Sequence, residues 1–439
     1  MRNETVSRES GMGRRAFVNS GTCLVFGLAM AVAPALAAND PPIAVAARLV
    51  DDGRVARLSF DLSGPVEAVA RPIADPSRII VDIPEVNFQI PPGAGRGGEG
   101  ADALVKAYRF GALAPGKSRV VIELARPACL GKVETRPVAK GAEPARLTIE
   151  MKPCSAEAFA AAAAAAAPPP APAPSASASA SPQGGPPVIV LDPGHGGVDG
   201  GAYGVKGTVE KLIVFEFAQE LKRRLESTGH FRVLMTRNSD AFVSLEDRVK
   251  IAEEANAALF ISIHADTLPG PSSDVSGATV YTCSDRASDA EAARIADREN
   301  AADKAAGVDT RRAADPGVAD ILFDLKRRET RAYAHIFSHG LVSEWQGAGR
   351  LNRNPQRSAG FMVLKAPDFP SVLVELGYLS NAQDVANMTS ADWRGRATAA
   401  MAVSIERFFA PAPPTKPVES VAASRPSPNA PGLAQRQGP

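Results

Sequence analysis

The sequence predicts an α/β domain, with a mostly parallel sheet between helices, preceded by an all-β sandwich domain. Two observations support this division. Apolar runs in the C-terminal half are hydrophobic at nearly every position, which is typical of strands covered on both faces, and amphipathic segments separate them. The N-terminal half instead carries short strand-like runs between Gly, Pro and Asp clusters. A chain of 439 residues is long enough for two or three domains.

Charge and composition exclude several protein classes. Lys and Arg number 49 against 48 Asp and Glu, so no large basic excess favours nucleic acid as the main partner. Four cysteines in this length exclude a disulfide-stapled mini-protein, and the absence of a Cys-x-x-Cys pair excludes an all-cysteine zinc ribbon. Beyond the N-terminus no apolar run reaches the roughly 18 residues of a membrane span.

Residues 1–37 have the three parts of an export signal. Arg14 and Arg15 precede an apolar stretch at about residues 21–33, and an Ala-x-Ala site follows, with cleavage expected after Ala37. The arginine pair followed by Phe17 resembles a twin-arginine signal, whose substrates cross the membrane already folded; an ordinary Sec signal remains the alternative. No membrane span is expected in the mature chain.

The β domain is expected over residues 38–154. Its strand-like runs are 43–49, 55–62, 78–83, 106–110, 118–124 and 146–151. The domain contains no histidine, so it is a poor place for metal chemistry. In an oxidising compartment Cys129 and Cys154 form either a disulfide or two small buried thiols, and both possibilities stay open. Cys283, which ends an apolar run further along, is expected to pack as a small hydrophobe.

Residues 155–187 form an Ala/Pro/Ser linker and residues 410–439 a disordered tail. The linker begins with an alanine run, which can be helical, but the prolines from Pro168 onward cannot continue a helix. A semi-rigid spacer is therefore expected. All five histidines lie between residues 195 and 339, so catalytic chemistry is expected in residues 188–409.

Three strands of the α/β domain end in residues suited to metal chemistry. Strands are predicted at 188–191, 231–235, 257–263, 277–281 and 371–374, with helices at 209–227, 245–255 and 393–409. His195 follows the first strand, His264 the third and Glu375 the fifth. Because ligands of open α/β sheets bind at the carboxyl ends of strands, these three side chains should converge.

Two imidazoles and one carboxylate are the ligands of a catalytic zinc with an open position for water. His195 and His264 supply the nitrogens, and Glu210 is the preferred carboxylate because it lies where a loop enters a helix. Zinc lowers the pKa of bound water from about 15.7 to about 7, and Glu375 would act as general base and later protonate the leaving nitrogen. Three other carboxylates remain candidate ligands, namely Asp192, Asp199 and Asp266.

The other histidines are expected to be structural. His335 and His339 are four residues apart on a probable helix but lack the Glu of a His-Glu-x-x-His motif, and His230 lies at a helix end. No Gly-x-Ser-x-Gly turn occurs, which argues against a serine hydrolase.

Four segments of the C-terminal half resemble the type 3 family of zinc-dependent N-acetylmuramoyl-L-alanine amidases of bacterial cell-wall division. They are Val-Ile-Val-Leu-Asp-Pro-Gly-His-Gly-Gly (188–197), Thr-Val-Glu-Lys (208–211), Ala-Leu-Phe-Ile-Ser-Ile-His-Ala-Asp (258–266) and Val-Leu-Val-Glu-Leu-Gly-Tyr-Leu-Ser-Asn (372–381). The resemblance implies that His195, Glu210 and His264 bind one zinc ion and that Glu375 is the catalytic carboxylate. It also implies cleavage between the muramoyl lactyl group and L-alanine, in the periplasm, during septal wall splitting. The N-terminal domain resembles an AMIN domain, which implies peptidoglycan binding.

An insert at about residues 285–331 is expected to regulate the site. It is rich in Ala, Arg, Asp and Glu, and over 288–306 it offers only Ile295 as a large apolar residue, so a helix there would dock weakly. The family resemblance implies an inhibitory helix that covers the zinc until a LytM-type activator protein displaces it, and Glu299 could occupy the open zinc position. A solvated surface helix is the alternative.

Two further functions compete with the amidase on the residues alone. A zinc peptidase that cuts peptide cross-links would use the same chemistry on a different amide. A catalytically dead wall-binding or activator protein would have lost a zinc ligand or Glu375, and this chain has lost neither.

Overall fold

The computed structural model describes residues 40–90, 95, 97–98, 100–137, 144–166, 185–268, 275–308 and 321–410, with the backbone alone described for 206 and 321–325. The expected export signal, the Pro/Ser part of the linker and the expected tail from residue 411 lie outside these ranges. No helix within them has the length and apolar character needed to cross a membrane.

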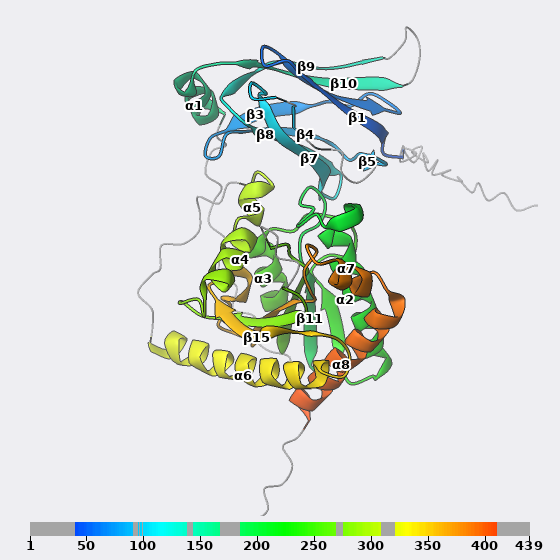
Figure 1. Ribbon diagram of the computed structural model, residues 1–439, viewed down its shortest axis with the longest axis vertical. Helices are drawn as coiled ribbons and strands as arrows, with labels where there is room; N and C mark the ends of the chain where they lie inside the picture. Colours follow the sequence, from blue (N-terminus) through cyan, green and yellow to red (C-terminus); the bar gives the residue numbers. More distant parts are fainter. Residues whose placement is uncertain are drawn as a thin grey trace, which may run out of the picture. The chain divides into compact units, whose positions relative to one another are not determined.

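The N-terminal domain is a sandwich of two sheets, as predicted (Figure 1). Neighbouring strands pair antiparallel, except for the parallel pair of β1(Ile43–Asp51) with β5(Asn87–Phe88). One sheet has the order β5(Asn87–Phe88), β1(Ile43–Asp51), β2(Ala56–Leu62), β10(Ala145–Pro153), β9(Ala128–Pro137). The other has the order β3(Val69–Ile73), β4(Arg78–Pro84), β8(Lys117–Leu124), β7(Val105–Ala114). Inward side chains such as Phe60, Val81 and Ile149 form its core.

Helix α1(Ala156–Ala165) shows that the linker starts later than predicted. Ser155 caps the helix, because its hydroxyl accepts a hydrogen bond of 3.1 Å from the backbone N–H of Ala158. Phe159 is buried in the core of the sandwich. The alanine run therefore forms a helix that belongs to the β domain, since one large apolar side chain anchors it there.

Cys129 and Cys154 form a disulfide, with their Cα atoms 5.7 Å apart. The bond ties the start of β9 to the residue that follows β10. We expect the Cys129→Ser/Cys154→Ser double variant to lose about 3 kcal/mol of unfolding free energy, because the bond closes a loop with a sequence separation of 25. Chemical denaturation measures this. A reductant should lower the wild-type midpoint and leave that of the variant unchanged; equal midpoints for both oxidised proteins would contradict the expectation.

The C-terminal domain has a mostly parallel sheet, as predicted. Its order is β12(Arg232–Met235), β11(Val188–Pro193), β13(Leu259–His264), β16(Ser371–Glu375), β14(Ala278–Cys283), β15(Leu351–Ala359). The first four strands run parallel, and β14 is antiparallel to β16. The carboxyl ends of β11, β13 and β16 therefore lie side by side at one edge of the sheet.

Helices cover both faces of this sheet (Figure 1). On β13 Ile261 belongs to an apolar cluster with residues of four helices, α2(Glu210–Ser227), α6(Ile321–Trp345), α8(Ala391–Phe409) and the short α7(Ala382–Met388). Phe260, its neighbour on the strand, faces the opposite side with α3(Leu245–Glu254), α4(Ala290–Asn300) and the 3-10 turn η2(Met362–Leu364). Because side chains alternate along a strand, His264 and Glu375 share the face of Phe260, which α3 and α4 cover.

Several elements carry no signal in the sequence. Strand β15 reads Leu-Asn-Arg-Asn-Pro-Gln-Arg-Ser-Ala, an edge strand without an apolar run and with a proline. Strands β3, β5 and β9 were also not predicted. The expected insert contains α4 and the short α5(Ala302–Ala305), whereas its last residues, from Ile321, are the first turns of α6.

Candidate active site

The loop after β11 places His195 at the carboxyl edge of the sheet. His195 itself has a left-handed φ of 59°, which is uncommon for a non-glycine residue. Gly194 lets the next strand approach, since a Cβ there would lie 2.3 Å from Cε1 of His264. Gly201 likewise leaves room for the side chain of Glu210, because a Cβ at position 201 would lie 2.6 Å from Oε2 of Glu210. The short loops are thus built around two imidazoles and a carboxylate.

Buried ionic contacts hold this loop. Arg248 of α3 donates to Asp192 at 2.5 Å and to the backbone carbonyl of His195 at 2.8 Å. Asp192 also accepts hydrogen bonds from Thr236 and Ser262. Burial alone would raise the pKa of Asp192, but Arg248 and the two hydroxyls lower it. Arg248 and Asp192 therefore act as a fixed support beneath His195.

His195, Glu210 and His264 come together as one buried cluster. One donor atom from each lies within 4.8 Å of the other two. Glu210 Oε2 lies 3.2 Å from His195 Nε2, and its Oε1 lies 3.2 Å from His264 Nδ1. Glu210 begins α2 directly after a loop, and backbone N–H groups of Ala202 and Ala265 donate to its two oxygens. The sequence proposed these three residues as ligands, and the fold assembles them.

The three alternative carboxylates have other partners. Both carboxylate oxygens of Asp192 already accept hydrogen bonds, from Arg248, Thr236 and Ser262. Asp199 lies 2.8 Å from Nδ1 of His195, the nitrogen that faces away from the cluster. Asp266 pairs with Arg298 of α4. Asp199 thus orients an imidazole, a role that the sequence did not separate from direct ligation.

The donor set fits a divalent cation. The three side chains are buried and provide two imidazole nitrogens and one carboxylate, the ligand set of catalytic zinc sites. Burial lowers the pKa of His195, but the surrounding carboxylates Glu210 and Asp199 raise it well above its ordinary value. The pocket therefore stabilises positive charge at this point, which a metal ion held by neutral imidazoles would supply.

Glu375 lies beside the cluster at the same level of the sheet. It is paired in register with His264 on the neighbouring strand, and its Oε2 accepts a hydrogen bond of 2.9 Å from the backbone N–H of Asp266. Burial, followed by the negative charges of Asp266 and Glu210, raises the pKa of Glu375 well above its ordinary value. Oε1 has no hydrogen-bond partner in the described part of the chain. A carboxyl with raised proton affinity and one open oxygen is suited to proton transfer.

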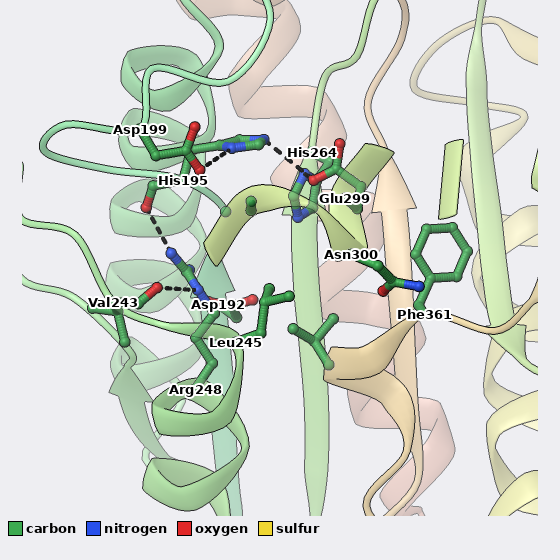
Figure 2. A pocket seen from close by; sticks show the side chains of 13 residues that line it. Asp192, His195, Asp199, Val243, Leu245, Arg248, His264, Glu299, Asn300 and Phe361 are labelled. Carbon is green, nitrogen blue, oxygen red and sulfur yellow. Dashed lines mark hydrogen bonds and ion pairs between the residues drawn. The ribbon is translucent and has the colours of Figure 1, made fainter. Parts of the chain in front are cut away.

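Helix α4 covers the cluster, and Glu299 points into it (Figure 2). Glu299 Oε2 lies 3.4 Å from His195 Nε2 and 3.2 Å from His264 Nδ1. The free space between α4 and the sheet edge is only about 10 Å³, room for roughly one water molecule, and its wall includes Val243, Phe361 and Val363. Glu299 therefore stands at the position where a substrate would approach the cluster.

Polar contacts on either side of Glu299 hold α4 down. Arg298 pairs with Asp266 and donates to the carbonyl of Thr267 at 2.7 Å. The Asn300 side chain donates to the carbonyl of Gly360 at 2.9 Å and accepts from the N–H of Met362 at 2.7 Å. Sequence reasoning missed these contacts, as it missed Arg248, because nothing local marks their partners.

The remaining histidines lie away from the cluster. His335 and His339 are exposed on α6, and His230 is exposed just after α2, 3.8 Å from Glu406. Cys283 is a free, buried thiol at the end of β14.

Comparison with known proteins identifies the family. Residues 189–407 match the family model described as N-acetylmuramoyl-L-alanine amidase, and residues 45–151 match the AMIN domain. The amidase AmiC of Escherichia coli O6:H1 is 31% identical over 350 residues, which cover 77% of this chain and 82% of that protein. This chain belongs to the AMIN-containing type 3 N-acetylmuramoyl-L-alanine amidases.

Two further relatives of this amidase illustrate the range of the family. AmiC of Neisseria meningitidis serogroup B is 30% identical over 382 residues, which cover 84% of this chain and 90% of that protein. The solved catalytic domain of CwlV from Bacillus (Paenibacillus) polymyxa is 25% identical, with a TM-score of 0.36, and the match covers 51% of this chain and 97% of that domain.

The contact between Asp199 and His195 leads to a prediction about metal affinity. In the amidase variant Asp199→Asn, the carboxylate that accepts the hydrogen bond of 2.8 Å is lost. We expect zinc affinity to fall about 10- to 100-fold, because such partners fix the orientation and basicity of a ligating imidazole. Competition with a chromogenic chelator measures it. Asp392→Asn, at an exposed carboxylate of α8, is the control; equal affinities for both variants would contradict the role of Asp199.

Proposed function

We propose that this amidase hydrolyses the amide between N-acetylmuramic acid and the L-alanine of the peptidoglycan stem peptide, with one zinc ion bound by His195, Glu210 and His264. The observation that carries the proposal is the buried cluster of these three side chains next to Glu375. Membership of the family supports the choice of scissile bond.

Glu375 is the proposed general base. When bound, zinc supplies a Lewis acid and makes water nucleophilic near neutral pH. Glu375 takes a proton from the attacking water and later delivers it to the nitrogen of L-alanine, so that the lactyl group leaves as a carboxylic acid and the stem as an amine. Asp199 holds the His195 ring with Nε2 toward the cluster, and the N–H of Asp266 orients Glu375.

The proposed setting is the periplasm, where the enzyme splits the septal wall and separates daughter cells. Its relatives are cell-wall amidases, and residues 45–151 match the AMIN domain, for which we propose peptidoglycan binding. The N-terminal sequence pattern of an export signal supports this location.

Helix α4 is proposed to inhibit the enzyme until a partner removes it. Glu299 lies against both imidazoles, where it would take the position that substrate or water needs. A LytM-type activator protein is the proposed partner. The helix docks through three buried apolar residues, Ala292, Ile295 and Ala296, so most of its hold comes from polar contacts, which a partner could replace with its own.

Zinc analysis and product identification test the proposed function together. The mature protein should bind one zinc ion, and digestion of peptidoglycan should release stem peptides with a free L-alanine amine, which mass spectrometry detects. A chelator should abolish this release and added zinc should restore it. Products cut inside the stem or cross-link would indicate a zinc peptidase instead. Zinc binding without any hydrolysis, even after α4 is released, would indicate a wall-binding protein.

A further inference from the structure

Arg357 is a buried cation on the face of the sheet that carries the active site. It lies on β15 in register with Tyr281 of β14, and its side chain is only 7% exposed. Tyr281 and Ala359 both pack in the apolar cluster that includes Ile295 of α4. Because side chains alternate along a strand, Arg357 shares this face, which is also the face of His264 and Glu375.

Helix α4 provides the anionic partners of this arginine. Arg357 Nη1 donates to Glu291 Oε1 at 2.6 Å and lies 3.4 Å from Asp289 Oδ1, at the N-terminal end of the helix. The other guanidinium nitrogens are held by β15 itself, through the carbonyl of Asn354 and the side chain of Asn352. Displacement of α4 would therefore leave the guanidinium in place while Nη1 loses Glu291, its closer carboxylate; Asp289, 3.4 Å away, follows Ser288, which is hydrogen-bonded to β15.

With α4 displaced, the guanidinium becomes accessible while β15 still orients its donors, so the opened enzyme presents a preorganised site for an anion at this position. We propose that Arg357 binds a carboxylate of the stem peptide in the opened enzyme, at the position that Glu291 occupies when α4 is docked. The inference rests on the proposed function and adds a substrate-binding residue to it. A guanidinium fixed by its own strand is well suited to recognise a carboxylate, because its donors are already oriented.

The spacing along α4 agrees with the length of a stem peptide. Glu291 and Glu299 lie eight positions apart on the helix, which separates them by about 12 Å along its axis. An extended peptide spans about 3.3–3.6 Å per residue, so three to four stem residues cover that distance. Stem peptides carry free carboxylates beyond L-alanine. Helix α4 thus resembles the substrate at two points, with Glu299 at the metal cluster and Glu291 at Arg357.

Arg357→Gln and Glu291→Gln both break the ion pair between β15 and α4. Comparing them distinguishes a substrate-binding role of Arg357 from a role that is limited to holding α4 in place. In the full mature chain opened by Glu299→Ala, we compare two soluble muramoyl tripeptides, one with free carboxylates and one with all carboxylates amidated. The opened parent should show a lower KM for the acidic peptide. Both variants break the ion pair that holds α4 and so raise the opened fraction alike. Measured against Glu291→Gln, Arg357→Gln should raise the KM of the acidic peptide relative to that of the amidated peptide about 10- to 100-fold, the loss of one hydrogen bond to a charged group. Glu291→Gln should keep the preference for the acidic peptide. Arg353→Gln, at an exposed arginine of the same strand, is the matched control.

The outcomes are distinct. If Arg357→Gln and Glu291→Gln behave alike, or if the opened parent does not prefer the acidic peptide, the inference is wrong. Thermal melting shows whether Arg357→Gln folds. If it does not, Arg357→Lys replaces it, because lysine keeps the positive charge but lacks the paired N–H donors of the guanidinium. Arg357→Lys should show an intermediate preference for the acidic peptide, and an undiminished preference would overturn the inference. If the opened parent binds zinc but cleaves neither peptide, the proposed function itself fails, and this inference falls with it.

Discussion

Glu375→Gln should abolish most of the hydrolysis while the protein still binds zinc. The amide keeps the shape of the side chain but cannot accept a proton, and a general base contributes about 10²- to 10⁴-fold to a rate. We therefore expect kcat to fall by that factor in a chain opened by Glu299→Ala, with KM nearly unchanged. Release of stem peptides from labelled peptidoglycan measures the rate, and metal analysis measures the zinc content.

A matched carboxylate outside the site provides the control for this loss. Glu406 is partly exposed on α8, and Glu406→Gln should leave both zinc content and rate unchanged. Full activity of a zinc-loaded Glu375→Gln protein would show that another group takes the proton. Loss of zinc from the variant would instead mean that Glu375 supports the metal cluster, and the role proposed for it would need to change.

Glu299→Ala should raise the activity of the protein in the absence of any partner. Glu299 lies 3.2–3.4 Å from the imidazole nitrogens, and its removal deletes the charged contact between α4 and the cluster. Hydrogen bonds to charged groups contribute about 1.5–3 kcal/mol, so the opened population should rise about 10- to 100-fold. Basal peptidoglycan hydrolysis measures this gain, and deletion of residues 286–316 should increase it in the same direction.

Asp297 gives a control on the same helix. It is an exposed carboxylate two positions from Glu299, so Asp297→Asn should leave basal activity unchanged. A folded Glu299→Ala protein with unchanged or lower basal activity would argue that α4 is a passive cover. The contacts of Arg298 and Asn300 would remain in the variant, so complete opening is not expected.

The candidate site was largely predictable because its residues follow strands. His195, His264 and Glu375 each stand at the end of an apolar run, and the rule that ligands bind at carboxyl ends of strands brings them to one edge. The rule does not say which carboxylate completes a metal site. Asp199 and Glu210 were both candidates, and only the fold shows that Asp199 contacts the outer nitrogen of His195 while Glu210 contacts both rings.

Other parts of the protein gave no local signal. Strand β15 is polar and contains a proline, so no apolar periodicity marks it, and Arg357 within it has no pattern that relates it to Glu291. Helix α1 was assigned to the linker because alanine composition alone does not reveal where a helix docks; the burial of Phe159 decides that.

Hydrophobic periodicity and strand-end motifs are local properties, so they sufficed to predict the two-domain organisation, the mostly parallel sheet and the set of side chains able to hold a metal. Which of those side chains meet became visible in the folded chain, where α4 also brings Glu299 to His195 and His264, and Glu291 to Arg357. Those contacts join segments far apart in the chain, and their geometry depends on strand order and on the docking of a helix, neither of which local periodicity encodes.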